Sequence, residues 1–173
     1  LSGFGCDDLS LAIAAAGCLL DYVKDTQRNE LPHLTSIRHE RQSDSVILDA
    51  ATRRNLEIDL NLHGGEDNTL FAVYNSTVTA MGTRHLKRWL HRPVTVRSLL
   101  EDRLDAVSRL GLNYAFETTR QALKSISDLE RILARVALRS SRPRDLTRLR
   151  DSLWALPALK TATPQDTNLL QTI

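Results

Sequence analysis

The sequence has little of what marks a membrane, secreted or metal-binding protein. It contains no run of about 18 apolar residues, so no membrane span is expected. Its two cysteines, Cys6 and Cys18, form no paired motif, which favours a reducing compartment over a disulfide framework. The five histidines include no HExxH arrangement, and His85 and His91 lie six residues apart rather than three or four. No metal site is therefore predicted.

Motifs for nucleotide hydrolysis and nucleophilic catalysis are also missing. A phosphate-binding loop needs a lysine directly after a glycine, and none of the four lysines follows one. The GxSxG serine motif is absent as well. The pairs Glu101-Asp102 and Asp128-x-Glu130 fall in expected first helical turns, where negative charge offsets the helix dipole. We therefore expect no catalytic, cofactor-binding or metal-ligating residue in this chain.

What the chain does have is ordinary globular composition with an unusual share of arginine. Hydrophobic residues make up 42% and charged residues 25%, as in a typical globular protein. The net charge of +2 is too small to imply nucleic acid by itself. Arginine supplies 19 of the 23 basic residues, and seven of these lie between Arg131 and Arg150. Its planar fork suits carboxylates and phosphates better than lysine does.

Apolar residues recur at helical spacing along most of the chain, which predicts a mostly α fold. An amphipathic helix is expected over 9–24, and further helical segments over 50–56 and 69–74. Asp49 and Thr79 are expected to cap helices, the second of which ends before Pro93. A short strand is predicted over 45–48, because Val46 and Ile47 are β-branched.

The second half of the chain is expected to be helical throughout. Apolar stripes are formed by Leu100, Leu104, Val107 and Leu110, and by Leu129, Ile132, Leu133 and Val136. Capping-box spacing occurs at Ser98-x-x-Glu101 and Ser127-x-x-Glu130. Pro143 suits a first helical turn, and Pro157 and Pro164 are expected to mark the end of the last helix.

Two blocks of sequence are specific enough to name a family. LDAATRRNLEI (48–58) and T-A-M-G-T-R-H-L-K-R-W-L-x-x-P (79–93) closely resemble the start of the core domain of MutS, the DNA mismatch-recognition ATPase. The segment DLERILARVALRSSRPRDL (128–146) resembles a later part of the same domain. Ala80 departs from the proline usual in that family, and His85 from an apolar residue.

The resemblance implies a domain organisation. GFGCDDLSLAIAAAGCLLDYVKDTQR (3–28) resembles the last part of the α/β MutS connector domain, which assigns 1–32 to that domain's C-terminal end. Residues 33–48 would link it to the core, and 49–173 would form the first part of a helical core that leads into the lever helix. The chain begins with Leu1 and its only methionine is Met81, so we expect a piece of a longer protein.

The resemblance also implies a function for that longer protein. Members of the family work as homodimers that clamp duplex DNA and bind mismatches through an N-terminal domain. A C-terminal ATPase, which uses ATP and Mg, drives conversion to a sliding clamp, and a MutL-type protein is an expected partner. The setting would be the cytoplasm, at the bacterial nucleoid during repair. Neither the mismatch-reading domain nor the ATPase is expected in these residues, so the chain itself would not be an enzyme.

What remains for this chain is a mechanical role in coupling ATPase state to the DNA clamp. We expect a structural hub, on which other domains pack, at Leu86, Trp89, Leu90, Leu129, Ile132 and Leu133.

An alternative function rests on the basic segment between Arg139 and Arg150. It would be a stand-alone helical DNA-binding module, or a surface that contacts a neighbouring domain, through Arg139, Arg142, Arg144, Arg148 and Arg150. The same arginines could instead form a solvated helix face paired with Asp128, Glu130, Asp145 and Asp151. A third possibility is an enzyme whose site has no recognised motif.

Overall fold

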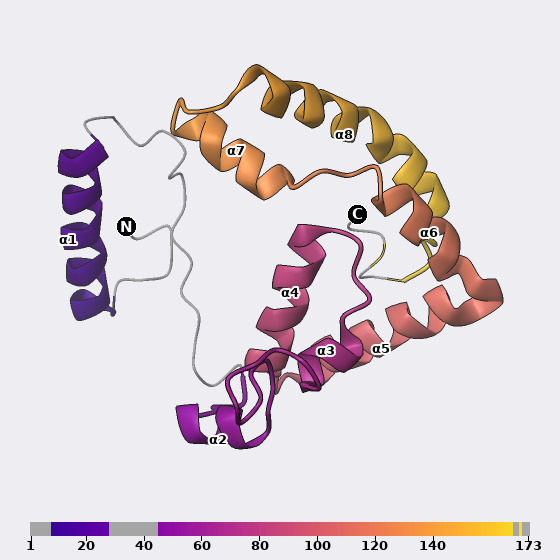
Figure 1. Ribbon diagram of the computed structural model, residues 1–173, viewed down its shortest axis with the longest axis horizontal. Coiled ribbons are helices and arrows are strands. Elements are labelled where there is room, and N and C mark those ends of the chain that lie inside the picture. The colour runs from indigo at the N-terminus through magenta and orange to yellow at the C-terminus, as the bar shows by residue number, and fades with distance from the viewer. Residues whose placement is uncertain (1–7, 28–44, 168–169, 171–173) are drawn as a thin grey trace.

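The helices account for most of the described chain. The computed structural model describes residues 8–27, 45–167 and 170 (Figure 1). Its helices are α1 (Ser10–Gln27), α2 (Ala50–Asn55), α3 (Leu70–Tyr74), α4 (Ala80–His91), α5 (Arg97–Gly111), the 3-10 turn η3 (Leu112–Tyr114), α6 (Ala115–Leu123), α7 (Leu129–Ala137) and α8 (Pro143–Ala162). The mostly α fold class is therefore confirmed.

The short strand predicted over 45–48 does not form. Ser45 makes one isolated antiparallel bridge with Val94, and the Val46 N–H donates to the Pro93 carbonyl at 2.7 Å. A strand needs a partner that continues the ladder. Val94 lies between α4 and α5, and the chain turns into α5 three residues later. The β-branched pair Val46 and Ile47 therefore remains an exposed extended segment.

Three short polar side chains cap helix starts, and the sequence predicted two of these caps, Asp49 and Thr79. Asp49 accepts from the Thr52 N–H at 2.6 Å, Thr69 from Ala72 at 3.1 Å and Thr79 from Gly82 at 3.0 Å. Each bond satisfies a backbone donor that the first helical turn leaves open. Pro143 occupies the first turn of α8, also as predicted.

Other local expectations were wrong. Val96 precedes α5 without a side-chain cap, so Ser98 lies inside the first turn instead of capping it. Asp128, not Ser127, caps α7. α8 does not end at Pro157 but continues to Ala162. A proline inside a helix removes one backbone N–H donor, and the turns on either side of it keep the helical conformation. The Thr161 hydroxyl donates to the Pro157 carbonyl at 3.0 Å.

The packed centre lies where α8 meets α6 and α7. The Ser152 hydroxyl is fully buried and accepts from the Ser127 N–H at 2.9 Å, which joins α8 to the start of α7. Thr119 of α6 donates to the Ala162 carbonyl at the other end of α8, also at 2.9 Å. The buried apolar side chains of the described residues are Ile58, Phe71, Ala106, Ile126, Ile132, Leu159 and Leu170.

The apolar stripes are only partly covered. Leu104 and Val107 on α5 are each 64% exposed, and Leu133 on α7 is 53% exposed although its neighbour Ile132 is buried. On α1, the predicted face holds the half-buried positions, such as Ile13 and Leu20, and the remaining described side chains are mostly exposed. The apolar residues therefore recur at helical spacing as predicted, but the helices of the described chain do not cover the stripes that they form.

Thr79 caps α4, whereas Ser98 was predicted to cap a helix and does not, and substituting each residue tests this difference. We expect Thr79→Ala to lower the free energy of unfolding by about 1 kcal/mol, because the Gly82 N–H loses its acceptor. Ser98→Ala, the matched control, should stay within about 0.5 kcal/mol of the parent chain. Urea denaturation of both variants measures this, and equal losses would contradict the cap assignment.

Candidate functional site

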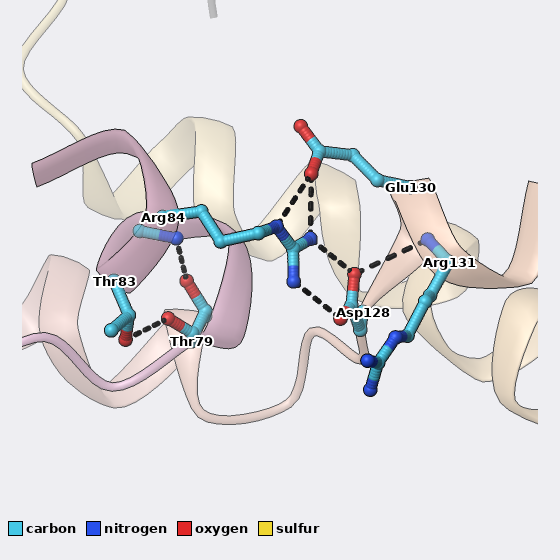
Figure 2. A network of polar contacts seen from close by, with 7 residues as sticks. Thr79, Thr83, Arg84, Asp128, Glu130 and Arg131 are labelled. Atoms are coloured by element: carbon cyan, nitrogen blue, oxygen red, sulfur yellow. Dashed lines mark hydrogen bonds and ion pairs between the residues drawn. The ribbon is translucent and has the colours of Figure 1, made fainter. Parts of the chain in front are cut away.

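One guanidinium joins two helices that are far apart in the sequence. Arg84 on α4 donates to both carboxylate oxygens of Asp128, at 2.8 and 2.7 Å, and to Glu130 at 3.1 and 2.6 Å (Figure 2). The two partners lie 44 and 46 residues later, at the start of α7. The bidentate fork fixes direction as well as distance between the helices.

Local structure places both ends of this network. The Thr79 cap begins α4 one turn before Arg84, and Asp128 is the N-cap of α7, where it also accepts from the Arg131 N–H at 3.3 Å. Hydrogen bonds from Arg84 and then from the Arg131 backbone lower the pKa of Asp128. The same carboxylates raise the pKa of Arg84. Asp128 is thus both helix cap and ion-pair partner.

A second polar cluster holds α7 against α8. Arg135 of α7 donates to Asp145 of α8 at 3.0 Å, and the Arg142 N–H donates to the other carboxylate oxygen at 3.1 Å. Asp145 is only 4% exposed, and these bonds lower its pKa, with the Arg142 backbone contributing most. Further along, Arg120 of α6 donates to the Ser76 carbonyl just before α4.

The six predicted hub residues fall on α4 and α7 but differ in burial. Ile132 is buried, Leu133 is exposed, and Leu86, Trp89, Leu90 and Leu129 are half-buried. Trp89 lies with its ring 4.9 Å from the His85 ring and 3.9 Å from the Arg103 guanidinium of α5. Burial beside this ring lowers the pKa of Arg103. Their role as a hub stays a prediction.

The five predicted arginines lie along the α7–α8 corner and the first half of α8. Arg139 follows α7 with a φ of 52°, and Arg142 precedes α8. All five side chains are exposed. Among the described residues, the guanidiniums of four make no hydrogen bond or ion pair, and these are Arg139, Arg142, Arg144 and Arg148. Contact of these arginines with DNA or another domain stays a prediction.

Arg150 differs from the other four because it is engaged within α8. It pairs with Asp151 at 2.7 Å and lies over the Trp154 ring at 4.8 Å. Trp154 is 72% exposed. Of the acids expected to pair with the basic segment, Asp151 does so through Arg150. Asp145 pairs instead with Arg135 of α7, and Asp128 and Glu130 pair with Arg84.

The described residues contain no group of three His, Cys, Asp or Glu side chains that could hold a metal. A hollow beside α5 is lined by the carboxylates of Asp102, Asp105 and Asp166. Asp166 already pairs with Arg109 at 2.6 Å. Across the same described ranges, no helix is long and apolar enough to cross a bilayer.

Arg84 is the residue that sequence reasoning missed. It lies in the T-R-H-L-K-R run, and its partners were interpreted as helix-start acids only. Local spacing cannot join residues 44 positions apart. The available clue was that Asp128-x-Glu130 places two carboxylates beside one helix start, which is one more than a cap requires.

The comparisons with protein families agree with this geometry. The model of MutS domain III matches residues 51–172, and the model of MutS domain II matches residues 1–35. The chain belongs to the MutS family. In this MutS chain, α3 to α8 and all but the first residue of α2 fall within the domain III match, and α1 falls within the domain II match. The boundaries predicted at 32 and 48 stay predictions.

Separating the two roles of Asp128 gives a test by substitution and pH. We expect Asp128→Ala to cost about 1–2 kcal/mol, since both cap and pair are lost. Asp128→Asn should cost less, because asparagine caps as well as aspartate does. Because the pKa of Asp128 is lower in the folded chain than in the unfolded chain, its ionised form stabilises the fold at pH values above the unfolded pKa. That contribution is lost once the pH has fallen below the folded pKa. The difference between the parent chain and Asp128→Asn should therefore be complete above about pH 4 and shrink as the pH falls further toward the lowered pKa of folded Asp128.

Urea midpoints of the three proteins between pH 3 and pH 7 are the measurement. A gap between the parent chain and Asp128→Asn that persists unchanged at low pH would contradict the ion-pair contribution.

The two tryptophans provide a matched pair for hub packing. Trp89→Ala should lower the free energy of unfolding by about 2 kcal/mol, roughly half the cost at a fully buried tryptophan, because the ring is half-buried against His85 and Arg103. Trp154→Ala should cost under about 0.5 kcal/mol, since that ring is largely exposed. Equal losses in urea denaturation would exclude Trp89 as a packing residue.

Proposed function

We propose that this MutS chain is a structural core that couples nucleotide state to the DNA clamp of a mismatch-repair protein, with no chemistry of its own. Such coupling requires helices that move as one body when a neighbouring domain moves. The observation on which the proposal depends is the Arg84 network, which joins α4 to α7 by a planar fork with four hydrogen bonds.

The other polar contacts extend this connection in both directions. Arg135 and Asp145 join α7 to α8, and Arg120 joins α6 to the segment before α4. The acceptor in each contact is either a backbone carbonyl or a carboxylate at the start of a helix, such as Asp145 in the first turn of α8. A displacement applied to α8 would therefore reach α4 through directional bonds instead of through deformable packing.

Uncovered apolar side chains supply the faces on which other domains would pack. Leu104 and Val107 project from α5, and Leu153 and Trp154 from α8, all at least half exposed. Large apolar side chains left exposed in this way are typical of interaction sites. We infer that these faces contact the remaining parts of the parent protein.

The parent protein is proposed to bind mismatched duplex DNA as a homodimer, to hydrolyse ATP with Mg and to act with a MutL-type partner. These properties follow from membership of the MutS family together with the sequence motifs. The residues matched here belong to domains II and III, so the nucleotide site would lie elsewhere in the parent.

A second candidate function is direct DNA contact by the basic segment. The observation in its favour is that Arg144 and Arg148, one helical turn apart on α8, are exposed and unpaired among the described residues. Two free guanidiniums at this spacing can meet adjacent phosphates.

Fluorescence anisotropy of labelled duplexes distinguishes the two functions. Matched and G·T-mismatched duplexes are titrated with the chain at low and at physiological salt. The coupling role predicts no binding at physiological salt, because mismatch recognition would belong to other domains. Preference for the mismatched duplex would overturn it.

Equal binding to both duplexes that weakens with salt would instead favour the basic segment. Arg144→Ala/Arg148→Ala should then reduce the slope of log K against log salt by about 2, one unit per phosphate contact. Lys124→Ala/Arg131→Ala removes the same charge away from α8 and is the matched control.

A further inference from the structure

A hollow between α2, the following loop and the end of α4 is used by neither function above. Its volume is about 450 Å³, and its wall includes Arg53 and Arg54 of α2, Leu60 and Leu62 of the loop, and His91 of α4. In Figure 1, α2 and this loop lie together beside one end of α4. The hollow therefore combines side chains from three separate segments of the MutS domain III match.

Two arginines and one carboxylate line this hollow, which leaves its wall with a net positive charge. Arg53 and Arg54 are exposed, and within the described ranges neither guanidinium has a hydrogen bond or ion-pair partner. The one carboxylate in the wall, Asp59, is already engaged, since its Oδ2 lies 3.0 Å from His91 Nε2. The other ring nitrogen of His91, Nδ1, is enclosed without a partner among the described groups. An anionic group entering the hollow would meet two free donors.

The loop that forms the opposite wall is held in place by its own hydrogen bonds. Asn61 Oδ1 accepts from the Gly65 N–H at 2.8 Å and from the His63 N–H at 3.0 Å. Gly64 has a φ of +85°, which glycine adopts without strain. The Glu57 carboxylate accepts from the Leu62 N–H at 2.8 Å. The exposed side chains of Leu60 and Leu62 are thereby presented from a fixed backbone.

We propose that this hollow is a docking site for an acidic, leucine-bearing peptide segment of a partner protein. A glutamate or aspartate of the segment pairs with Arg53 and Arg54, and its leucines cover Leu60 and Leu62. Charge complementarity explains the arginine pair, and burial of apolar surface explains the two leucines.

The chemistry of the wall favours a peptide over a phosphate backbone. A phosphate would gain from the two arginines, but it would leave Leu60 and Leu62 uncovered and would approach Asp59. An extended peptide places residues i and i+2 on one face, so an acidic and an apolar residue two positions apart present both kinds of group to the same wall. The site is independent of the coupling role, because it involves neither the Arg84 network nor the α8 arginines.

The test uses the whole chain and a labelled probe, followed by anisotropy. The probe is an acetylated hexapeptide with two leucines and one glutamate at every second position and serines between them, so that one face carries both kinds of group. The parent chain should bind it, and Arg53→Ala/Arg54→Ala should raise the dissociation constant at least about tenfold, as expected for lost charge-assisted hydrogen bonds. The same peptide with glutamine in place of glutamate should bind at least about tenfold more weakly. The control Lys124→Ala/Arg131→Ala should bind as the parent chain does.

Circular dichroism checks that each variant is folded, and the single change Arg54→Gln replaces the double variant if that one unfolds. Unchanged binding by the arginine variants, or equal binding of the glutamine peptide, would overturn the proposal. Displacement of the peptide by inorganic phosphate or duplex DNA at equal charge concentration would assign the arginines to phosphate and would also overturn it.

Discussion

The arrangement of the second half of this chain depends on one guanidinium. Arg84 meets two carboxylates at the start of α7 with four hydrogen bonds, across a gap of more than 40 residues. The pair is partly exposed, so solvent screening keeps its net contribution to stability modest. Its importance is directional, because a planar fork accepts only one orientation of the two helices. Asp128 adds to this by capping α7 with the same carboxylate.

Directional contacts matter here because the apolar core is small. Few side chains are fully buried, and polar residues such as Ser152, Asp145 and Thr163 are buried among them with their bonds satisfied. Leucines at helical spacing remain exposed on α5, α7 and α8. Caps and polar contacts therefore fix the positions of the helices, while the apolar faces of the helices remain exposed to contact other domains. That combination suits a unit whose neighbours complete the core.

The exposed features of the MutS chain then divide into three surfaces of different chemistry. The α5 and α8 leucines with Trp154 are apolar, the α7–α8 corner is rich in exposed arginines, and the hollow beside α2 combines two arginines with two leucines. Their separation is consistent with separate partners. The coupling role uses the first, the alternative DNA role the second, and the proposed peptide site the third.

Much of the helical organisation followed from local chemistry. Asp49 and Thr79 cap helices as expected, because a capping side chain acts on a backbone N–H only two or three residues away. The family could be recognised for a similar reason, since its motifs are contiguous blocks.

Tertiary structure decided what depends on distant neighbours. It selected Asp128 over Ser127 as the cap of α7, because Asp128 also meets Arg84. It buried Ile132 and left Leu133 exposed, although both lie on one predicted stripe. It left 45–48 without a strand, since the bridge of Ser45 with Val94 is not continued within the described residues. Periodicity shows which residues can share a face, but burial requires another element to cover that face, and its position is set by the path of the whole chain.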